Sequence, residues 1–153
     1  DQLKKEYADE PDVHIAGGNL YQLLGRNSDA QREYITAVQL GSASFEAWQN
    51  LLAIESEMGQ IDSLIFHSEQ GLEIFPNQAI MYYFNGYGHL RRNHHKAAAT
   101  ALEQAKRLSP NNPALVNEIN GLLGSAYNGM KDYVRSDKAY DEALLFNEPP
   151  QIV

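Results

Sequence analysis

Small residues and helix-ending residues recur along this chain with a period of 34 residues. Units that start at Pro11, Phe45 and Ala79 share their fifteenth, twentieth and twenty-seventh places: Gly25, Gly59 and Asn93; Ala30, Leu64 and Ala98; Ala37, Gly71 and Ala105. Glycine and asparagine tolerate the left-handed backbone with which helices end. Each unit therefore predicts a first helix, a tight turn and a second helix whose small residues allow close helix contact.

Prolines and capping residues indicate where the helices begin and end. The thirty-second place of the three units holds Ser42, Pro76 and Pro110, and a proline there cannot continue a helix. The segment 28–31, Ser-Asp-Ala-Gln, has the form of a capping box at the start of a second helix. Asn77 is placed to cap the first helix of the third unit.

A fourth unit follows the same pattern after a shift of four residues. It aligns best from Asn117, which puts these residues in the expected places: Leu123, Gly124, Tyr127, Tyr133, Ser136, Tyr140 and Ala143. Four residues are about one helical turn, and Asn112 followed by Pro113 is a favourable helix start. We therefore expect the first helix of this unit to run from Pro113 to about Asn128 and to be longer than its counterparts.

The repeats divide the chain into four units with fragments at both ends. The units are 11–44, 45–78, 79–112 and 113–150; residues 1–10 fit the end of a preceding helix, and residues 151–153 would open a further unit. Because the chain starts within one repeat and ends at the opening of another, we expect a segment of a longer array. A repeat stack without end caps exposes apolar faces. End-to-end self-association would then involve Leu3 and Tyr7 at one end and Tyr140, Leu144 and Phe146 at the other.

Many of these residues resemble the tetratricopeptide repeat family. The resemblance rests on Trp48, Leu51, Gly59, Leu64, Leu72 and Pro76, and on Leu123 to Tyr127 with Tyr133, Tyr140, Ala143 and Leu144. It covers nearly the whole chain and implies an all-α, right-handed α-solenoid of antiparallel helix pairs with a concave inner surface. The chain departs from the family pattern at Gly17, where leucine is usual, and at Glu55 and His89, where tyrosine is usual.

Two segments show a further resemblance in their amino-acid sequence. Residues 81–86 and 140–144 look like tetratricopeptide proteins of Bacteroidetes-type bacteria, many of which are exported or anchored by lipid. This resemblance would imply a periplasmic or outer-membrane-associated protein whose signal precedes the chain. The residues themselves leave the compartment undetermined, since the absence of cysteine fits cytosol and periplasm alike.

In this family the first helices line the concave groove, and the resemblance implies a set of groove-facing residues here. The set is Asn19, Leu23, Gln49, Glu57, Tyr83, Tyr87, Leu90, Arg91, Ser125 and Asn128. Tyr83, Tyr87 and Arg91 follow one another at one-turn spacing on one helix face, and aromatic residues and arginine are favoured anchors of protein interfaces. Two interpretations remain open: the tyrosines contact a partner, or they pack against an adjacent helix.

A helix-pair stack offers a long surface and no reaction pocket, which favours a non-catalytic scaffold that binds a peptide or protein segment in its groove. One alternative is a structural spacer or self-association segment within a larger protein. Another is the docking arm of an enzyme or secretion component whose chemistry lies elsewhere. Exposure of the groove tyrosines would favour a binding surface, and their burial would favour the spacer.

Composition and charge limit the classes of binding partner that we expect. The formal net charge is −8 and the isoelectric point is near 5.0, whereas nucleic-acid binding needs a basic stripe. The charge is uneven, about −7 over residues 1–62 and about +2 over residues 63–112. No apolar run approaches the roughly 18 residues of a membrane span. We therefore expect a protein or peptide ligand, no nucleic acid and no direct membrane insertion.

Candidate chemistry is sparse. The chain has no cysteine, which excludes thiolate metal sites, disulfides and cysteine nucleophiles. His89, His94 and His95 are close in sequence, but zinc needs three or four ligands in suitable geometry, and His95 stands where a packing aromatic residue is usual. Carboxylate pairs fall at helix ends or outer faces rather than in a pocket. We expect no catalytic residue, no metal and no cofactor.

Overall fold

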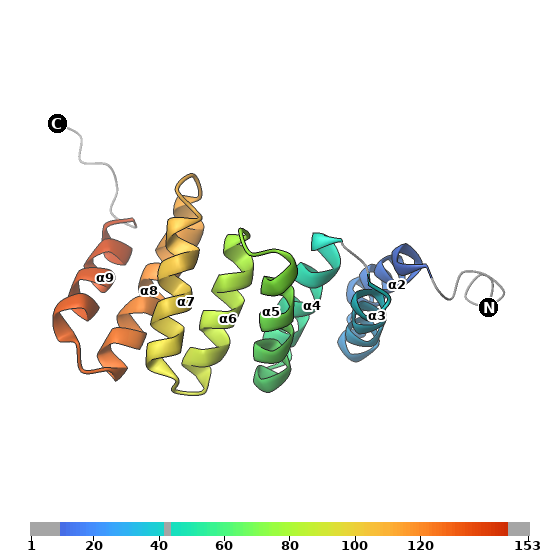
Figure 1. The fold of residues 1–153 in the computed structure, drawn as a ribbon, viewed down its shortest axis with the longest axis horizontal. Coiled ribbons are helices and arrows are strands. Elements are labelled where there is room, and N and C mark those ends of the chain that lie inside the picture. Colours follow the sequence, from blue (N-terminus) through green and yellow to red (C-terminus); the bar gives the residue numbers. More distant parts are fainter. Residues whose placement is uncertain (1–9, 42–43, 147–153) are drawn as a thin grey trace. The chain divides into compact units, whose positions relative to one another are not determined.

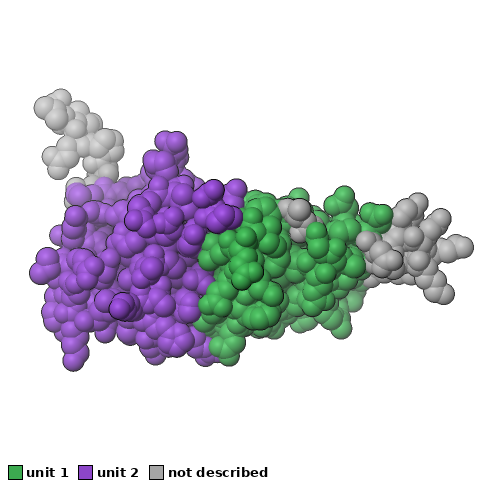
Figure 2. All heavy atoms as spheres, viewed as in Figure 1, with its two compact units in different colours: residues 1–75 green, residues 76–153 purple. Residues whose placement is uncertain are grey.

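The computed structural model describes residues 10–41 and 44–146. The described residues form eight α-helices joined by turns, and none of them is in a β-strand. The helices pair in chain order (Figure 1). The chain divides into two compact units, residues 1–75 and residues 76–153 (Figure 2). The expectations for residues 1–9, Ser42 and 147–153, which include the partial repeats, lie outside the described residues.

Unit 1 consists of two helix pairs, α2 (Pro11–Leu23) with α3 (Asn27–Gln39), and α4 (Phe45–Glu57) with α5 (Ile61–Ile74). The turn inside each pair is made by a glycine in the left-handed conformation. Gly25 has a φ of 69° and Gly59 a φ of 67°, which few other residues adopt without strain. The predicted helix stops of these two units are confirmed.

Unit 2 also consists of two pairs, α6 (Ala79–Arg91) with α7 (His95–Arg107), and α8 (Pro113–Gly129) with α9 (Tyr133–Leu145). Asn93 takes the left-handed conformation predicted for it, with a φ of 60°. In the last pair Lys131 does the same, with a φ of 61°, at a place where the sequence offers neither glycine nor asparagine. No helix of the described residues combines the length and apolar character needed to cross a bilayer.

Helix α8 is 17 residues long, whereas the other helices of unit 2 have 13. Its start is capped as the sequence predicts. The side chain of Asn112 accepts a hydrogen bond from the backbone N–H of Leu115 at 3.1 Å, and Pro113 occupies the first turn, where no donor is lost.

Two predicted caps are wrong. Residues 28–31 lie inside α3, because the backbone N–H groups of Asp29 and Ala30 already donate to the carbonyl of Arg26. The turn thus starts the helix before Ser28, and the Asp29 carboxylate binds the guanidinium groups of Arg26 and Arg32 instead of backbone N–H groups. Asn77 does not cap α6 either. That helix starts after Gln78, whose carbonyl accepts from Met81, and no side chain caps it.

Three of the helix pairs are held close by a glycine opposite a large side chain. A Cβ atom would lie 2.5 Å from Tyr34 if built on Gly18, 2.6 Å from Leu102 if built on Gly86, and 2.5 Å from Tyr140 if built on Gly124. The corresponding places in α4 and α5 hold Leu52 and Ser68, both fully buried, so there the large side chain lies on the first helix. A Cβ atom built on Gly17 would lie 3.4 Å from the Glu33 side chain, so Gly18 and not Gly17 makes the close contact of this pair.

Candidate functional site

Tyr83, Tyr87 and Arg91 of α6 are named here the α6 surface. Some of these side chains are partly buried and one is exposed. The ring of Tyr83 packs edge-on against Phe84 at 5.3 Å and also against the core of unit 2. Its hydroxyl donates to Glu118 Oε2 on α8 at 3.1 Å. Tyr87 is partly buried, whereas Arg91 is exposed. The first tyrosine thus helps to hold α6 on α8, and the accessible surface lies toward Arg91.

The environment of Tyr83 keeps its hydroxyl protonated. Burial, the nearby carboxylate of Glu118 and the hydroxyl of Tyr87 together raise the pKa of Tyr83 to about 12. Tyr83 and Tyr87 are four residues apart and therefore lie on the same side of α6. The hydroxyl of Tyr83 remains the donor to Glu118 at neutral pH.

The other predicted residues of unit 2 differ in their burial and in their hydrogen bonds. Leu90 is partly buried against the core. Ser125 donates to the carbonyl of Gly121 at 3.3 Å and shares a hydrogen bond of 3.0 Å with the hydroxyl of Tyr140. Asn128 is exposed at the end of α8. Only Asn128 and Arg91 of the predicted set in unit 2 are exposed.

In unit 1 the predicted residues do not form one surface. Asn19 is engaged within the fold: its Oδ1 accepts from the hydroxyl of Tyr34 at 2.7 Å and from Asn50 Nδ2 at 3.1 Å. Leu23 is 86% exposed and Glu57 is exposed, whereas Gln49 is partly buried. Asn50, which binds Asn19, was not among the predicted residues. Its only sign in the sequence is that it follows Gln49 on the same helix.

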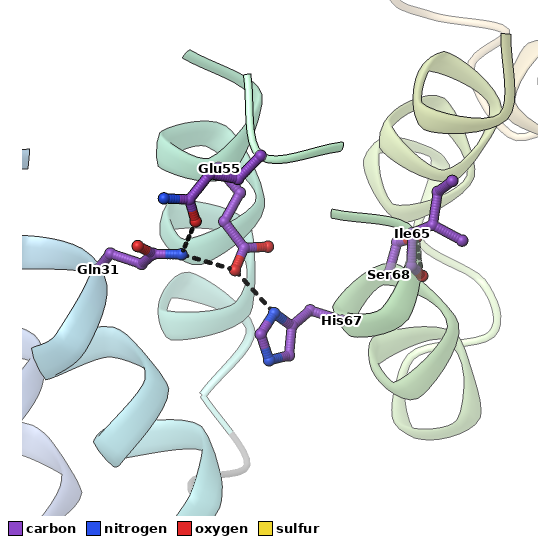
Figure 3. A network of polar contacts seen from close by, with 6 residues as sticks. Gln31, Glu55, Ile65, His67 and Ser68 are labelled. Atoms are coloured by element: carbon purple, nitrogen blue, oxygen red, sulfur yellow. Dashed lines mark hydrogen bonds and ion pairs between the residues drawn. The ribbon is translucent and has the colours of Figure 1, made fainter. Parts of the chain in front are cut away.

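Unit 1 also contains a buried polar network that sequence reasoning did not foresee. Glu55 of α4 is fully buried, and Figure 3 shows Gln31 of α3 and His67 of α5 reaching it from opposite sides. Its Oε1 accepts from Gln31 Nε2 at 3.1 Å and lies 2.8 Å from His67 Nδ1. Gln31 Nε2 also donates to Gln60. Among the described residues, Glu55 Oε2 has no hydrogen-bond partner.

The histidines of unit 2 do not assemble a metal site in the described residues. The Nδ1 atoms of His89 and His94 are 3.2 Å apart, and no group of three or more histidine or acidic side chains there could hold a metal ion. His95 packs on α8, where a Cβ atom added to Gly129 would lie 2.3 Å from its ring. The described residues thus offer packing and hydrogen bonding in this region rather than metal ligation.

Comparison with known proteins shows likeness at the level of structure. No family model matches the sequence, and no curated protein matches it. The structure of MamA from Desulfovibrio magneticus RS-1 matches with a TM-score of 0.79 at 18% identity, over 90% of this chain and 75% of that one. YrrB, described as a TPR protein with an unusual peptide-binding site, matches with a TM-score of 0.78 at 12% identity, over 92% and 70% of the two chains. The thermophilic TPR protein TTC0263 of Thermus thermophilus matches with a TM-score of 0.66 at 15% identity, over 92% and 76%.

The chain has the tetratricopeptide-repeat fold. The expected all-α solenoid of about four helix pairs is thereby confirmed. The first helices of the four pairs are α2, α4, α6 and α8. The departure at Glu55 concerns the interior of the fold, since its side chain is directed into a buried network and not to the surface.

Proposed function

We propose that this chain is a non-catalytic scaffold that binds a peptide or protein segment, and that the α6 surface takes part in the contact. Tyr87 and Arg91 are the residues of this surface that a ligand can reach most readily, and Tyr83 fixes the helix that carries them. Tyrosine and arginine supply much contact area together with hydrogen-bond donors, which is why they dominate protein interfaces.

The observation that carries the proposal is the one-turn spacing of Tyr83, Tyr87 and Arg91 along α6, together with the exposure of Arg91. The fold adds support, because tetratricopeptide repeats expose one face of each first helix over a long surface. YrrB is described as having a peptide-binding site, which supports the same class of ligand for this chain. A structural spacer, and a docking arm of a larger enzyme or secretion component, are the two alternatives.

A selection of peptides from a random displayed library, with the chain immobilised, tests this proposal. Peptides selected on the natural chain are measured against a Tyr87→Ala/Arg91→Ala variant by fluorescence anisotropy. We expect a loss of affinity of about tenfold or more, the size of an interface hot spot. Tyr83 is left unchanged because its ring packs on the core.

The matched control is Tyr133→Ala/Arg107→Ala, which also removes one exposed tyrosine and one exposed arginine of unit 2. Selected peptides should bind this variant with unchanged affinity. A selection that yields no binder would favour the spacer. Equal binding by all three proteins would place the binding surface away from α6.

A further inference from the structure

A hollow of unit 1 is lined by residues other than those proposed above. It has a volume of about 340 Å³ and is walled by α3, α4 and α5, and it is named here the Trp48 hollow. The residues used in the argument are Val38, Trp48, Phe66, His67, Glu73 and Ile74. Pockets that bind small groups measure roughly 300–1,000 Å³, so the Trp48 hollow can take a bulky side chain.

Two apolar residues that line the Trp48 hollow are exposed. Phe66 is 56% exposed and Ile74 is 50% exposed, although both belong to the same helix as the buried Leu64. They are eight residues apart, about two helical turns, and therefore lie on one side of α5. Two large apolar side chains kept in water beside a hollow are typical of a contact surface.

Trp48 forms part of the wall of the hollow and is only 4% exposed. Its indole Nε1 is itself buried and, among the described residues, has no acceptor. His67, which also lines the hollow, is oriented by the fully buried Glu55. The wall thus includes an aromatic side chain against which an apolar group of a ligand can pack.

The surroundings of the hollow are negatively charged. Between Glu33 and Leu90 the sequence has no lysine and no arginine, and all seven of its carboxylates are in residues 33–73. In the described part of unit 1 the two arginines, Arg26 and Arg32, both bind Asp29. Glu73, which lines the hollow, belongs to this acidic segment without basic residues, and so do all the other lining residues. Such a field attracts cationic partners and repels anionic ones.

We propose that the Trp48 hollow binds a peptide segment that carries a bulky apolar side chain between lysine or arginine residues. The apolar side chain enters between Phe66 and Ile74 and packs toward Trp48, and the basic residues contact the acidic side chains of α4 and α5. The residues of the hollow are not those of the α6 surface, so the chain would hold two segments, or two parts of one partner, on different residues.

Trp48 makes the proposal directly measurable, since it is the only tryptophan of the chain. The probe is a short synthetic peptide with a central phenylalanine flanked on both sides by lysine and arginine, titrated into the full chain. Binding should change the tryptophan emission and saturate. Raising the salt concentration should weaken it, because the flanking attraction is screened within about 10 Å at 0.1 M salt.

Two peptide controls separate the parts of the proposal. The peptide with serine in place of the central phenylalanine should bind at least about tenfold more weakly if the apolar side chain is the anchor. The peptide with glutamate in place of each basic residue should not bind. Equal binding of the serine peptide would overturn the proposal, because charge alone would then explain the contact.

On the protein side the test variant is Phe66→Ser/Ile74→Ser, and the control is Val134→Ser/Leu145→Ser, which alters apolar side chains of unit 2 that are 83% and 63% exposed. The first should lose affinity about tenfold or more, and the second should not. Unchanged affinity in the first, or no change of tryptophan emission with the natural chain, would overturn the proposal.

A second copy of the chain is the competing occupant, since the basic residues of unit 2 could meet the acidic unit 1. Sedimentation velocity without peptide decides this point. A monomer agrees with the proposal, whereas an oligomer that dissociates on Phe66→Ser/Ile74→Ser overturns it. If the peptide selection shows no binding at the α6 surface, the result for the Trp48 hollow still stands, because the two tests change different residues.

Discussion

The two units are built from the same kind of helix pair but fill their interiors with different chemistry. In unit 2 an apolar cluster that includes Ala98 and Leu102 lies beside buried polar residues that are all uncharged: Asn85, Ser109, Asn120 and Ser136. In unit 1 a fully buried carboxylate, Glu55, is enclosed by side chains of the neighbouring helices. The repeat pattern thus determines where helices meet, and it tolerates both an apolar and a polar way of filling the space between them.

The pairs of ionisable side chains in the two units differ in their exposure. Glu55 and His67 have side-chain exposures of 0% and 13%, whereas Lys106 and Glu142 of unit 2 have exposures of 32% and 35%. Charges taken out of water depend on their partner, because the interior screens little and solvates little. Charges at the surface remain solvated whether or not they are paired.

The largest effect is expected from His67→Ala. The substitution leaves Glu55 buried with Gln31 as its remaining partner, and removing one member of a buried pair typically costs about 3–5 kcal/mol. We expect a decrease of this size in the free energy of unfolding of unit 1. Urea unfolding followed by Trp48 fluorescence reports on unit 1, and far-UV circular dichroism reports on the whole chain.

His67→Gln is the matched control, since its side-chain amide can still donate to the carboxylate. It should lose clearly less stability than the alanine variant. If His67→Ala unfolds at the same urea concentration as the natural chain, Glu55 does not depend on its partner. The contrast between the two interiors would then carry no energetic meaning.

A smaller effect, in unit 2, is expected from Gly86→Ala. The added Cβ would lie 2.6 Å from Leu102 Cγ and 3.2 Å from the backbone oxygen of Ala98, so α6 and α7 would have to move apart. Overpacking of this kind costs about 1–3 kcal/mol. Gly121→Ala is the control, because a Cβ there meets nothing within 4 Å and alanine is favoured over glycine inside a helix by roughly 0.5–1 kcal/mol.

Thermal unfolding monitored by circular dichroism should therefore show the two substitutions acting in opposite directions. The midpoint should fall for Gly86→Ala and stay or rise for Gly121→Ala. In the second helix pair of unit 1, Leu52 occupies the place that corresponds to Gly86 and is fully buried. A Gly86→Ala variant as stable as the natural chain would mean that close approach is no more necessary in unit 2 than it is there.

The fold was predictable from the sequence because its signals are local and repeated. Gly25, Gly59 and Asn93 end helices through their own backbone preference, and all three take the left-handed conformation. Lys131 takes it although lysine has no such preference. Local patterns thus predicted three of the four turns, and the fourth has no local sign in the sequence.

The surface residues were less predictable, because exposure depends on which neighbours each helix meets. Tyr83 and Asn19 stand at groove places of the repeat, yet both are engaged by side chains of another helix. The burial of Glu55 had only one sign in the sequence, its departure from the usual tyrosine. Its partners Gln31 and His67 lie 24 residues before it and 12 residues after it, and no local pattern connects them.

The smallest effect is expected at the surface pair of unit 2, Lys106 and Glu142, whose Nζ and Oε2 atoms are 2.6 Å apart. A double-mutant cycle with Lys106→Met and Glu142→Gln should give a coupling of about 0.2–1 kcal/mol, the range of exposed pairs. In about 0.5 M salt the coupling should diminish, since both groups are accessible to ions. A coupling of several kcal/mol that persists in salt would show that this pair behaves like a buried one, and depth of burial would then no longer distinguish the charged pairs of the two units.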